Sequence, residues 1–280
     1  MAANIRVLTA IFLFFLGWIS LWAIVMLPLF KRFQWRPFQP TPPEQKLALL
    51  MPLYVLAPAA IFISNQISGQ SWQQLGLIWS LANAYAFGLG WVIAIAGLVL
   101  VLIAKSRCGL IKFQTESAPT TQGQGSLNQL LTIIGLVLIG IWIGSIEEII
   151  FRGWLQTQLQ WVFAPVLALG IGSLMFAVAH LIWDGRAGLW QQPGLWLLGA
   201  VLVTARWAQG DAIALASGLH AGWVTGLAYV GELLRPLPVA GKPTVLTGRS
   251  EQPLTDVWDF SLLLGTGLLI NTLPLISRLG

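Results

Sequence analysis

The chain has 280 residues, of which 56% are hydrophobic and only 9% are charged, and its formal net charge is +5. A charged fraction so far below the roughly 25% of soluble domains excludes an ordinary water-soluble protein. A basic chain can bind nucleic acid, but here the cations gather at the ends of apolar runs, which is typical of orientation in a membrane, so we expect no nucleic-acid partner.

Eight apolar segments of the sequence are candidates to cross a hydrocarbon core about 30 Å thick as helices. Within lipid the backbone polar groups have to be satisfied inside the segment, which favours helices over isolated strands. The sequence therefore predicts an all-α, polytopic, integral membrane protein that lies in the lipid bilayer of a cell inner or plasma membrane or of an internal membrane. In chain order, the predicted spans are residues 7–30, 47–64, 81–104, 128–155 (or to about 160), 165–183, 193–209, 212–230 and 259–276.

The loops between the first four spans differ in charge. The first and third loops are basic, whereas the second carries no charge. The positive-inside rule then predicts that both basic loops lie in the cytoplasm and that both chain termini lie outside. The basic residues are Lys31, Arg32, Arg36 and Lys46 in the first loop and Lys105, Arg107 and Lys112 in the third.

We expect one integral membrane domain with two parts. Residues 1–124 supply the amino-terminal spans and cytoplasmic loops, and residues 125–280 form a carboxyl-terminal helical bundle that carries the chemically important side chains. Two stretches rich in Gly, Ser, Thr, Gln and Pro, residues 105–127 and 241–253, are predicted to be flexible linkers.

Few ionisable side chains lie deep inside the predicted spans. Glu147 and Glu148 are the acidic pair most deeply embedded in apolar sequence, and Arg152 follows Glu148 by one helical turn. The two histidines of the chain, His180 and His220, lie in later spans. Such groups are costly in a membrane and indicate a functional site. Each also has a structural explanation, as an ion pair one helical turn apart or as a histidine hydrogen-bonded between helices.

Helix geometry predicts that these side chains converge. If the chain turns at residues 161–165, Glu147 lies fourteen residues before the turn and His180 lies fifteen after it. At about 1.5 Å per residue, both lie roughly 20 Å from the turn on antiparallel helices. His220, nine residues beyond Asp211, lies well inside a third helix. We therefore expect two carboxylates and two imidazoles in one apolar shell.

Such a cluster has the parts of an amide hydrolase. A shielded carboxylate can act as a general base on water. One imidazole can orient that water, and a second can donate a hydrogen bond to the oxyanion that forms when a carbonyl carbon is attacked. An arginine one turn from a carboxylate would keep that carboxylate ionised and fixed.

Three motifs occur in order on successive predicted spans. They are E-E-x-x-x-R at residues 147–152, F-x-x-x-H at residues 176–180, and a histidine at position 220. Together they resemble the CPBP family, which comprises CAAX proteases and bacteriocin-processing enzymes. The resemblance covers roughly residues 125–235 and implies an eight-helix intramembrane endopeptidase.

The resemblance also implies a role for each matching residue. Glu147 would be the general base that activates water, and His180 would help to hold that water. His220 would contribute to the oxyanion site. Glu148 and Arg152 would position the first glutamate and its helix.

One position departs from the family pattern. The third motif usually continues as H-x-x-x-N or H-x-x-x-D, and the corresponding residue here is Val224, followed by Thr225. We expect Phe176 and Thr225 to supply substrate or oxyanion support, although Thr225 is one residue out of register. Loss of one oxyanion donor can lower a rate by about 10²- to 10³-fold.

The sequence thus predicts an intramembrane endopeptidase that needs no cofactor and that hydrolyses membrane-embedded or membrane-anchored peptides with glutamate-activated water. A zinc peptidase with Glu147, His180 and His220 as ligands is the nearest alternative. It is less favoured because the H-E-x-x-H spacing is absent and adjacent helical side chains point about 100° apart. A catalytically silent scaffold or immunity-type membrane protein, favoured by Val224, and a proton-coupled transporter are further alternatives. No inverted repeat favours the transporter.

Overall fold

The computed structural model describes residues 2–113, 126–249 and 252–272 of the chain. Helices make up most of this part, which confirms the all-α class. The α-helices are α1 (Ala2–Phe33), α2 (Pro43–Ser68), α3 (Leu81–Arg107), α4 (Ser126–Glu148), α5 (Gln156–Gln160), α6 (Pro165–Asp184), α7 (Gln192–Ala208), α8 (Ala214–Tyr229), α9 (Thr244–Thr247) and α10 (Val257–Thr272). The shorter elements are the 3₁₀-helices η1 (Gln73–Leu75) and η3 (Gly185–Gln191), the π-helices η2 (Ile149–Leu155) and η4 (Val230–Leu234), and the strands β1 (Ile111–Phe113) and β2 (Pro236–Pro238).

Every predicted span coincides with a helix, although the last four residues of the eighth span lie outside the described residues. α8 is enclosed by other helices over most of its length, and α10 is a shorter apolar helix. The long helices α1, α2, α3, α4, α6 and α7 form a polytopic membrane bundle. Within the described ranges, the helical runs long and apolar enough to cross a membrane are Asn4–Phe33, Pro43–Ser68, Leu81–Arg107, Leu127–Gln160 and Pro165–Ala208, the last of which joins two predicted spans through η3.

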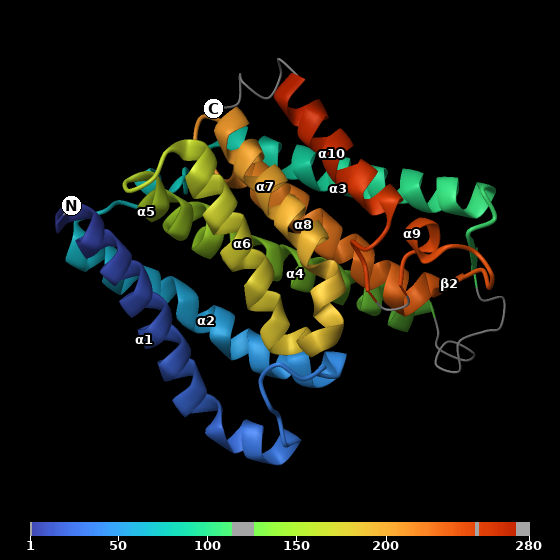
Figure 1. Cartoon of the computed structure of the whole chain (residues 1–280), viewed down its shortest axis with the longest axis horizontal. Coiled ribbons are helices and arrows are strands. Elements are labelled where there is room, and N and C mark those ends of the chain that lie inside the picture. The colour runs from blue at the N-terminus through green and yellow to red at the C-terminus, as the bar shows by residue number, and fades with distance from the viewer. Residues whose placement is uncertain (1, 114–125, 250–251, 273–280) are drawn as a thin grey trace.

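The two ends of the bundle differ in charge. Successive helices alternate in direction, so the connections after α1, α3, α6 and α8 gather at the end opposite the amino terminus (Figure 1). Lys46 of α2 pairs there with Asp184 of α6, and β1 pairs with β2. We call this the basic end, and the positive-inside rule predicts that it faces the cytoplasm. Its cations are Lys31, Arg32, Arg36, Lys46, Lys105, Arg107, Lys112, Arg186, Arg235, Lys242 and Arg249.

α8 passes through the middle of the bundle, between α3 and α4. Small residues allow this close approach, since a Cβ added to Gly218 would lie 2.0 Å from the carbonyl oxygen of Phe87 in α3. On the other side, a Cβ added to Gly144 of α4 would lie 2.5 Å from the backbone nitrogen of Ala221. These contacts fix the depth of α8, and with it the depth of His220.

Gly218→Ala should therefore lower the free energy of unfolding by about 1–3 kcal/mol, because the added methyl group forces α3 and α8 apart. Gly88→Ala in α3 is the matched control, since nothing lies within 4 Å of its added Cβ. The better helix propensity of alanine should leave that variant as stable as the wild type or slightly more stable. Unfolding of both purified variants in detergent, followed by circular dichroism, measures the difference. Equal stability would contradict the packing of α8 on α3.

The two predicted linkers contain more structure than expected. α3 continues to Arg107, and residues 111–113 form β1, while residues 114–125 lie outside the described residues. The second linker contains α9 and a bridge between Arg249 and Gln252. Polar, Gly-rich composition predicts loops, but here a distant segment, β2, supplies the backbone partners of β1.

Candidate active site

The helix that carries the two glutamates changes its winding directly after them. α4 ends at Glu148, and the next seven residues form the π-helix η2. Such segments are rare and are frequent at functional sites. Arg206 of α7, which is buried, donates hydrogen bonds to the carbonyl oxygen of Arg152 and, at 3.0 Å, to the hydroxyl of Thr157. A guanidinium from another helix thus satisfies backbone and side-chain acceptors along the altered turn.

α6 packs antiparallel against this segment after the turn at residues 161–164, as the helix-length argument predicted. The guanidinium carbon of Arg152 lies 4.2 Å from the centroid of the Phe176 ring. One turn closer to the connection, Gln156 approaches Gly172. One turn farther from it, His180 reaches the level of the glutamates, and it lines the same cavity as Glu147.

Glu148 is the fully buried centre of a charged network. Its Oε1 accepts a hydrogen bond from Nη1 of Arg152 at 2.9 Å and lies 2.8 Å from Nδ1 of His220. A carboxylate paired with arginine accepts hydrogen bonds, so Nδ1 of His220 carries a proton. The ion pair expected between Glu148 and Arg152 is therefore present, and it also fixes the orientation of the His220 ring.

The two oxygens of Glu147 have different surroundings. Oε1 accepts a hydrogen bond from the hydroxyl of Tyr54 in α2. Oε2 is buried, lies 3.6 Å from Nε2 of His220, and has no hydrogen-bond partner within the described part of the chain. The separation between Oε2 and Nε2 is too long for a good direct hydrogen bond. Oε2 can therefore still accept a hydrogen bond from a bound water or ligand.

His180 has a defined tautomer in its neutral form. Its Nδ1 lies 2.9 Å from the carbonyl oxygen of Phe176, which can only accept, so Nδ1 carries the proton and Nε2 is an acceptor. The Phe176 ring packs edge-to-face against both histidines, with centroid distances of 4.8 Å to His180 and 5.8 Å to His220. Phe176 therefore fixes both imidazoles through packing and does not line the cavity itself.

These groups meet at one cavity of about 510 Å³. This volume lies in the usual range for small-molecule and cofactor sites, about 300–1,000 Å³. Glu148 and Arg152 lie behind its wall. The polar lining comes from Lys46, Tyr54, Glu147, His180 and His220, and the aromatic lining from Phe15, Trp18, Trp22, Phe38, Phe151 and Trp183.

Thr225 lies elsewhere, and the expectation that it supports an oxyanion is corrected. Its side chain is buried against α4, where a Cβ added to Gly140 would lie 2.1 Å from its hydroxyl oxygen. Val224 lines the cavity in its place. One step along a helix turns a side chain by about 100°, which is enough to move Thr225 from the cavity to the α4 interface.

Nothing in the sequence pattern indicated that Tyr54, Lys46 or Arg206 would lie at or beside the site. One feature could have indicated Tyr54. It is a tyrosine in the middle of an apolar span, and a buried tyrosine hydroxyl needs a hydrogen-bond partner. For the zinc alternative, the structure provides no cluster of three or more His, Cys, Asp or Glu side chains arranged to hold a metal ion among the residues it describes.

Residues 129–226 match the family model described as type II CAAX prenyl endopeptidase Rce1-like. This segment, which is less than half of the chain, is similar to the CAAX protease domain. The matched segment runs from α4 to α8 and includes both glutamates, Arg152 and both histidines. No curated protein and no solved structure matches the chain. The match supports a protease at the level of the family, and the long apolar helices support a membrane protein.

Proposed function

We propose that the protein is a multi-pass intramembrane endopeptidase in which Glu147 activates the water that attacks the peptide bond. The observation that carries this proposal is the contrast between the two oxygens of one carboxylate. Oε1 is held by the Tyr54 hydroxyl, while Oε2 is buried, faces His220 and is free to accept. One oxygen is thus fixed, and the other is available to take a proton.

The attacking water would bind between Glu147 and His180. It donates one hydrogen to Oε2 of Glu147 and the other to Nε2 of His180, and its lone pair then points at the carbonyl carbon of the substrate. As the new C–O bond forms, Glu147 takes the proton. Aromatic side chains line much of the cavity, and such an apolar setting strengthens these fixed electrostatic interactions.

His220 would stabilise the oxyanion in its doubly protonated form. Its Nδ1–H is bonded to Glu148, and its Nε2–H is then free to donate to the negative oxygen. Charge balance supports this form, since the imidazolium and Arg152 together offset Glu147 and Glu148, and buried charges are tolerated when they are paired. When the intermediate collapses, Glu147 returns the proton to the amide nitrogen, the C–N bond breaks, and one water is consumed.

We propose no cofactor for this reaction, because the base, the water-orienting ring and the oxyanion donor all come from the chain. The proposed substrates are membrane-embedded or membrane-anchored peptides, since the cavity lies among membrane helices and has mostly apolar walls. Zinc held by Glu147, His180 and His220 is the competing mechanism, and it would make activity sensitive to chelators.

The proposal is tested by peptide cleavage with the purified protein in lipid vesicles. The wild type should cleave members of a peptide library, and both Glu147→Ala and His180→Ala should abolish this activity. Cleavage that survives both substitutions would overturn the assignment. Failure of the wild type to cleave any peptide would favour the catalytically silent scaffold. Val224 supports that alternative, because it places an apolar side chain in the cavity where the family pattern has Asn or Asp.

Tyr54→Phe should lower kcat by about 10²-fold, because the Glu147 carboxylate loses the hydrogen bond that aims it. KM should change little, since the ring that lines the cavity is retained. Tyr85→Phe is the matched control, because Tyr85 is 55% exposed on α3 and should leave kcat unchanged. Steady-state kinetics of both variants measure the effect. Equal kcat values would show that Tyr54 does not orient Glu147 for catalysis.

A further inference from the structure

A second cavity, of about 570 Å³, lies at the basic end of the bundle. The residues that line it come from two parts of the chain, between positions 98 and 111 and between positions 227 and 259. Both parts lie outside residues 129–226, the segment that is similar to the CAAX protease domain. A cavity of this volume is large enough to hold a small molecule. The similarity to the protease domain therefore does not explain it.

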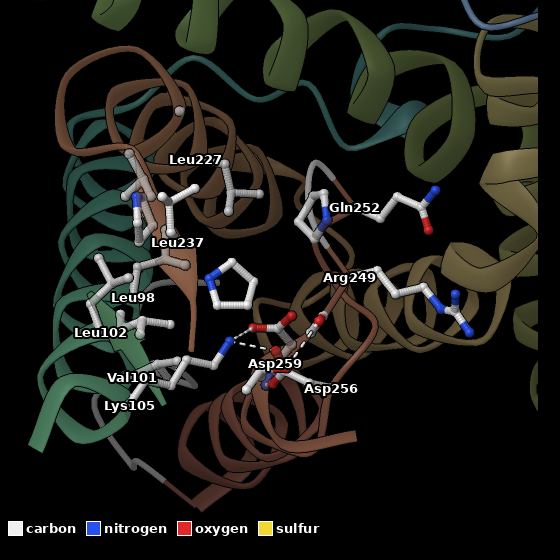
Figure 2. A pocket seen from close by; sticks show the side chains of 18 of the residues that line it. Leu98, Val101, Leu102, Lys105, Leu227, Leu237, Arg249, Gln252, Asp256 and Asp259 are labelled. Carbon is white, nitrogen blue, oxygen red and sulfur yellow. Dashed lines mark hydrogen bonds and ion pairs between the residues drawn. The ribbon is translucent and has the colours of Figure 1, made fainter. Parts of the chain in front are cut away.

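The walls of this cavity are largely apolar. Leu98, Val101 and Leu102 lie on one face of α3, because side chains three and four residues apart on a helix are neighbours (Figure 2). Lys105, one turn after Val101, ends this face close to the end of α3. Leu237 of β2 also lines the cavity and is 47% exposed. An apolar surface that runs to the end of a membrane-spanning helix suits the acyl chain of a lipid.

The charged side chains of the cavity form a buried group and an exposed group. In the buried group, Lys105 donates hydrogen bonds to Asp256 and Asp259 (Figure 2). These three side chains are at most 16% exposed, and their net charge is −1. Arg235, with a side chain that is 39% exposed, and Arg249, which is exposed, form the second group. The cavity therefore has a net charge of +1, and its accessible charge is positive.

Both arginines keep N–H donors for a ligand. The carboxylate of Glu232 lies 4.0 Å from Nη2 of Arg235, and an exposed pair at this distance contributes little. The guanidinium carbon of Arg249 lies 3.9 Å from the centroid of the Trp190 ring. Stacking on an aromatic ring uses the face of the guanidinium group and leaves the N–H groups at its edge available to a phosphate.

The backbone at Arg235 is strained. Arg235 directly follows η4 and has the left-handed angles φ 42° and ψ 59°. Glycine or asparagine is usual where a helix ends in this way, and other residues adopt the conformation at a cost of roughly 1–2 kcal/mol. Strained residues of this kind cluster at functional sites. Local structure alone therefore does not favour an arginine at this position, whereas an anionic ligand in the cavity does.

We propose that this cavity binds an anionic phospholipid, with the head group at Arg235 and Arg249 and an acyl chain along the apolar face of α3. The positive-inside rule predicts that the basic end faces the cytoplasm, where the membrane surface is negatively charged, and basic pockets between membrane helices on that side bind anionic head groups. A lipid is favoured over free phosphate because the walls beside the arginines are apolar. The bound lipid would join α3 to β2 and to the segment before α10.

Native mass spectrometry of the full-length protein in detergent tests this proposal. The protein is titrated with phosphatidylglycerol, which is anionic, or with phosphatidylcholine of the same acyl chains, which is zwitterionic. Phosphatidylglycerol should bind about 10-fold more tightly, as expected for a charge-assisted hydrogen bond at an exposed site. Arg235→Asn should remove most of this preference. Asparagine tolerates the left-handed backbone, so the variant should fold. Arg249→Gln, which leaves that backbone untouched, should also reduce the preference.

Lys242→Gln is the matched control. Lys242 is an exposed cation at the same end of the bundle and does not line the cavity. Its variant should keep the full preference for phosphatidylglycerol. Thermal unfolding gives a second measure, because a ligand that binds only the folded protein raises Tm. Phosphatidylglycerol should raise Tm of the wild type and of Lys242→Gln more than that of Arg235→Asn.

Equal binding of the two lipids, or a preference that survives both arginine substitutions, would overturn the proposal. Glycerol phosphate that binds as tightly as phosphatidylglycerol would show a site for free anions only and would overturn the assignment to a lipid. Tighter binding of phosphatidylethanolamine than of phosphatidylglycerol would also overturn it, because the carboxylates would then select an amine. Glu147→Gln should bind phosphatidylglycerol as the wild type does, so the result is independent of the proposed hydrolysis.

Discussion

Glu147→Gln should lower kcat by about 10²- to 10⁴-fold, which is the contribution expected from a general base. Glutamine has the same shape as glutamate, and its amide oxygen can still accept the Tyr54 hydrogen bond that Oε1 accepts in the wild type. It cannot take a proton from water at neutral pH. Substrate affinity should therefore stay within about twofold while turnover is lost. Single-turnover cleavage in lipid vesicles measures the two effects separately.

Glu44→Gln is the control for this substitution. Glu44 is exposed in the first turn of α2, at the basic end, and does not line the cavity. Its variant should cleave at the wild-type rate. If Glu147→Gln retained more than about a tenth of wild-type kcat, Glu147 would not be the base.

Arg152→Met should lower the free energy of unfolding by about 3–5 kcal/mol, because it leaves the Glu148 carboxylate buried without its strongest partner. Arg152 donates to Glu148 at 2.9 Å, and both side chains are at most 2% exposed. Methionine preserves most of the apolar contact with the Phe176 ring. Activity should fall as well, because the Glu148 carboxylate that orients His220 is disturbed. Chemical unfolding in detergent measures the stability change.

A double substitution separates charge from packing. Glu148→Gln together with Arg152→Met removes the uncompensated charge, so this protein should be more stable than Arg152→Met alone. The surface pair of Arg235 and Glu232, at 4.0 Å, provides the matched control. Arg235→Met should cost less than about 1 kcal/mol. Equal losses for Arg152→Met and Arg235→Met would show that the buried network does not stabilise the fold as described.

The positions of the helices, and the depth at which the glutamates and histidines meet, could be predicted from sequence. Apolar runs of span length predict helices, and counting residues from the turn at 161–164 is enough to bring His180 to the level of Glu147. The small residues beside His220, which are Gly218, Ala221 and Gly222, are also typical of close helix packing. These features depend on local sequence and on the geometry of single helices, and both can be read from one sequence.

Contacts between distant segments were not predictable in this way. The partner of Glu147, Tyr54, is 93 residues away in another part of the chain. The sequence of the π-helix η2 did not predict its altered winding, which is supported by Arg206 from a distant helix. Thr225 was misplaced because a one-residue offset on a helix changes the neighbour it faces. Each of these depends on how helices dock, and that is not encoded in any one segment.

The most direct test of the account is the cleavage rate of the purified protein before and after removal of divalent metals by a strong chelator, with Glu147→Gln measured alongside. If Glu147 activates water without a metal, the wild-type rate should be unchanged by the chelator, and the variant should remain inactive under both conditions. A wild-type rate that disappears on chelation and returns with added zinc would contradict the glutamate mechanism and assign Glu147, His180 and His220 to a metal site instead.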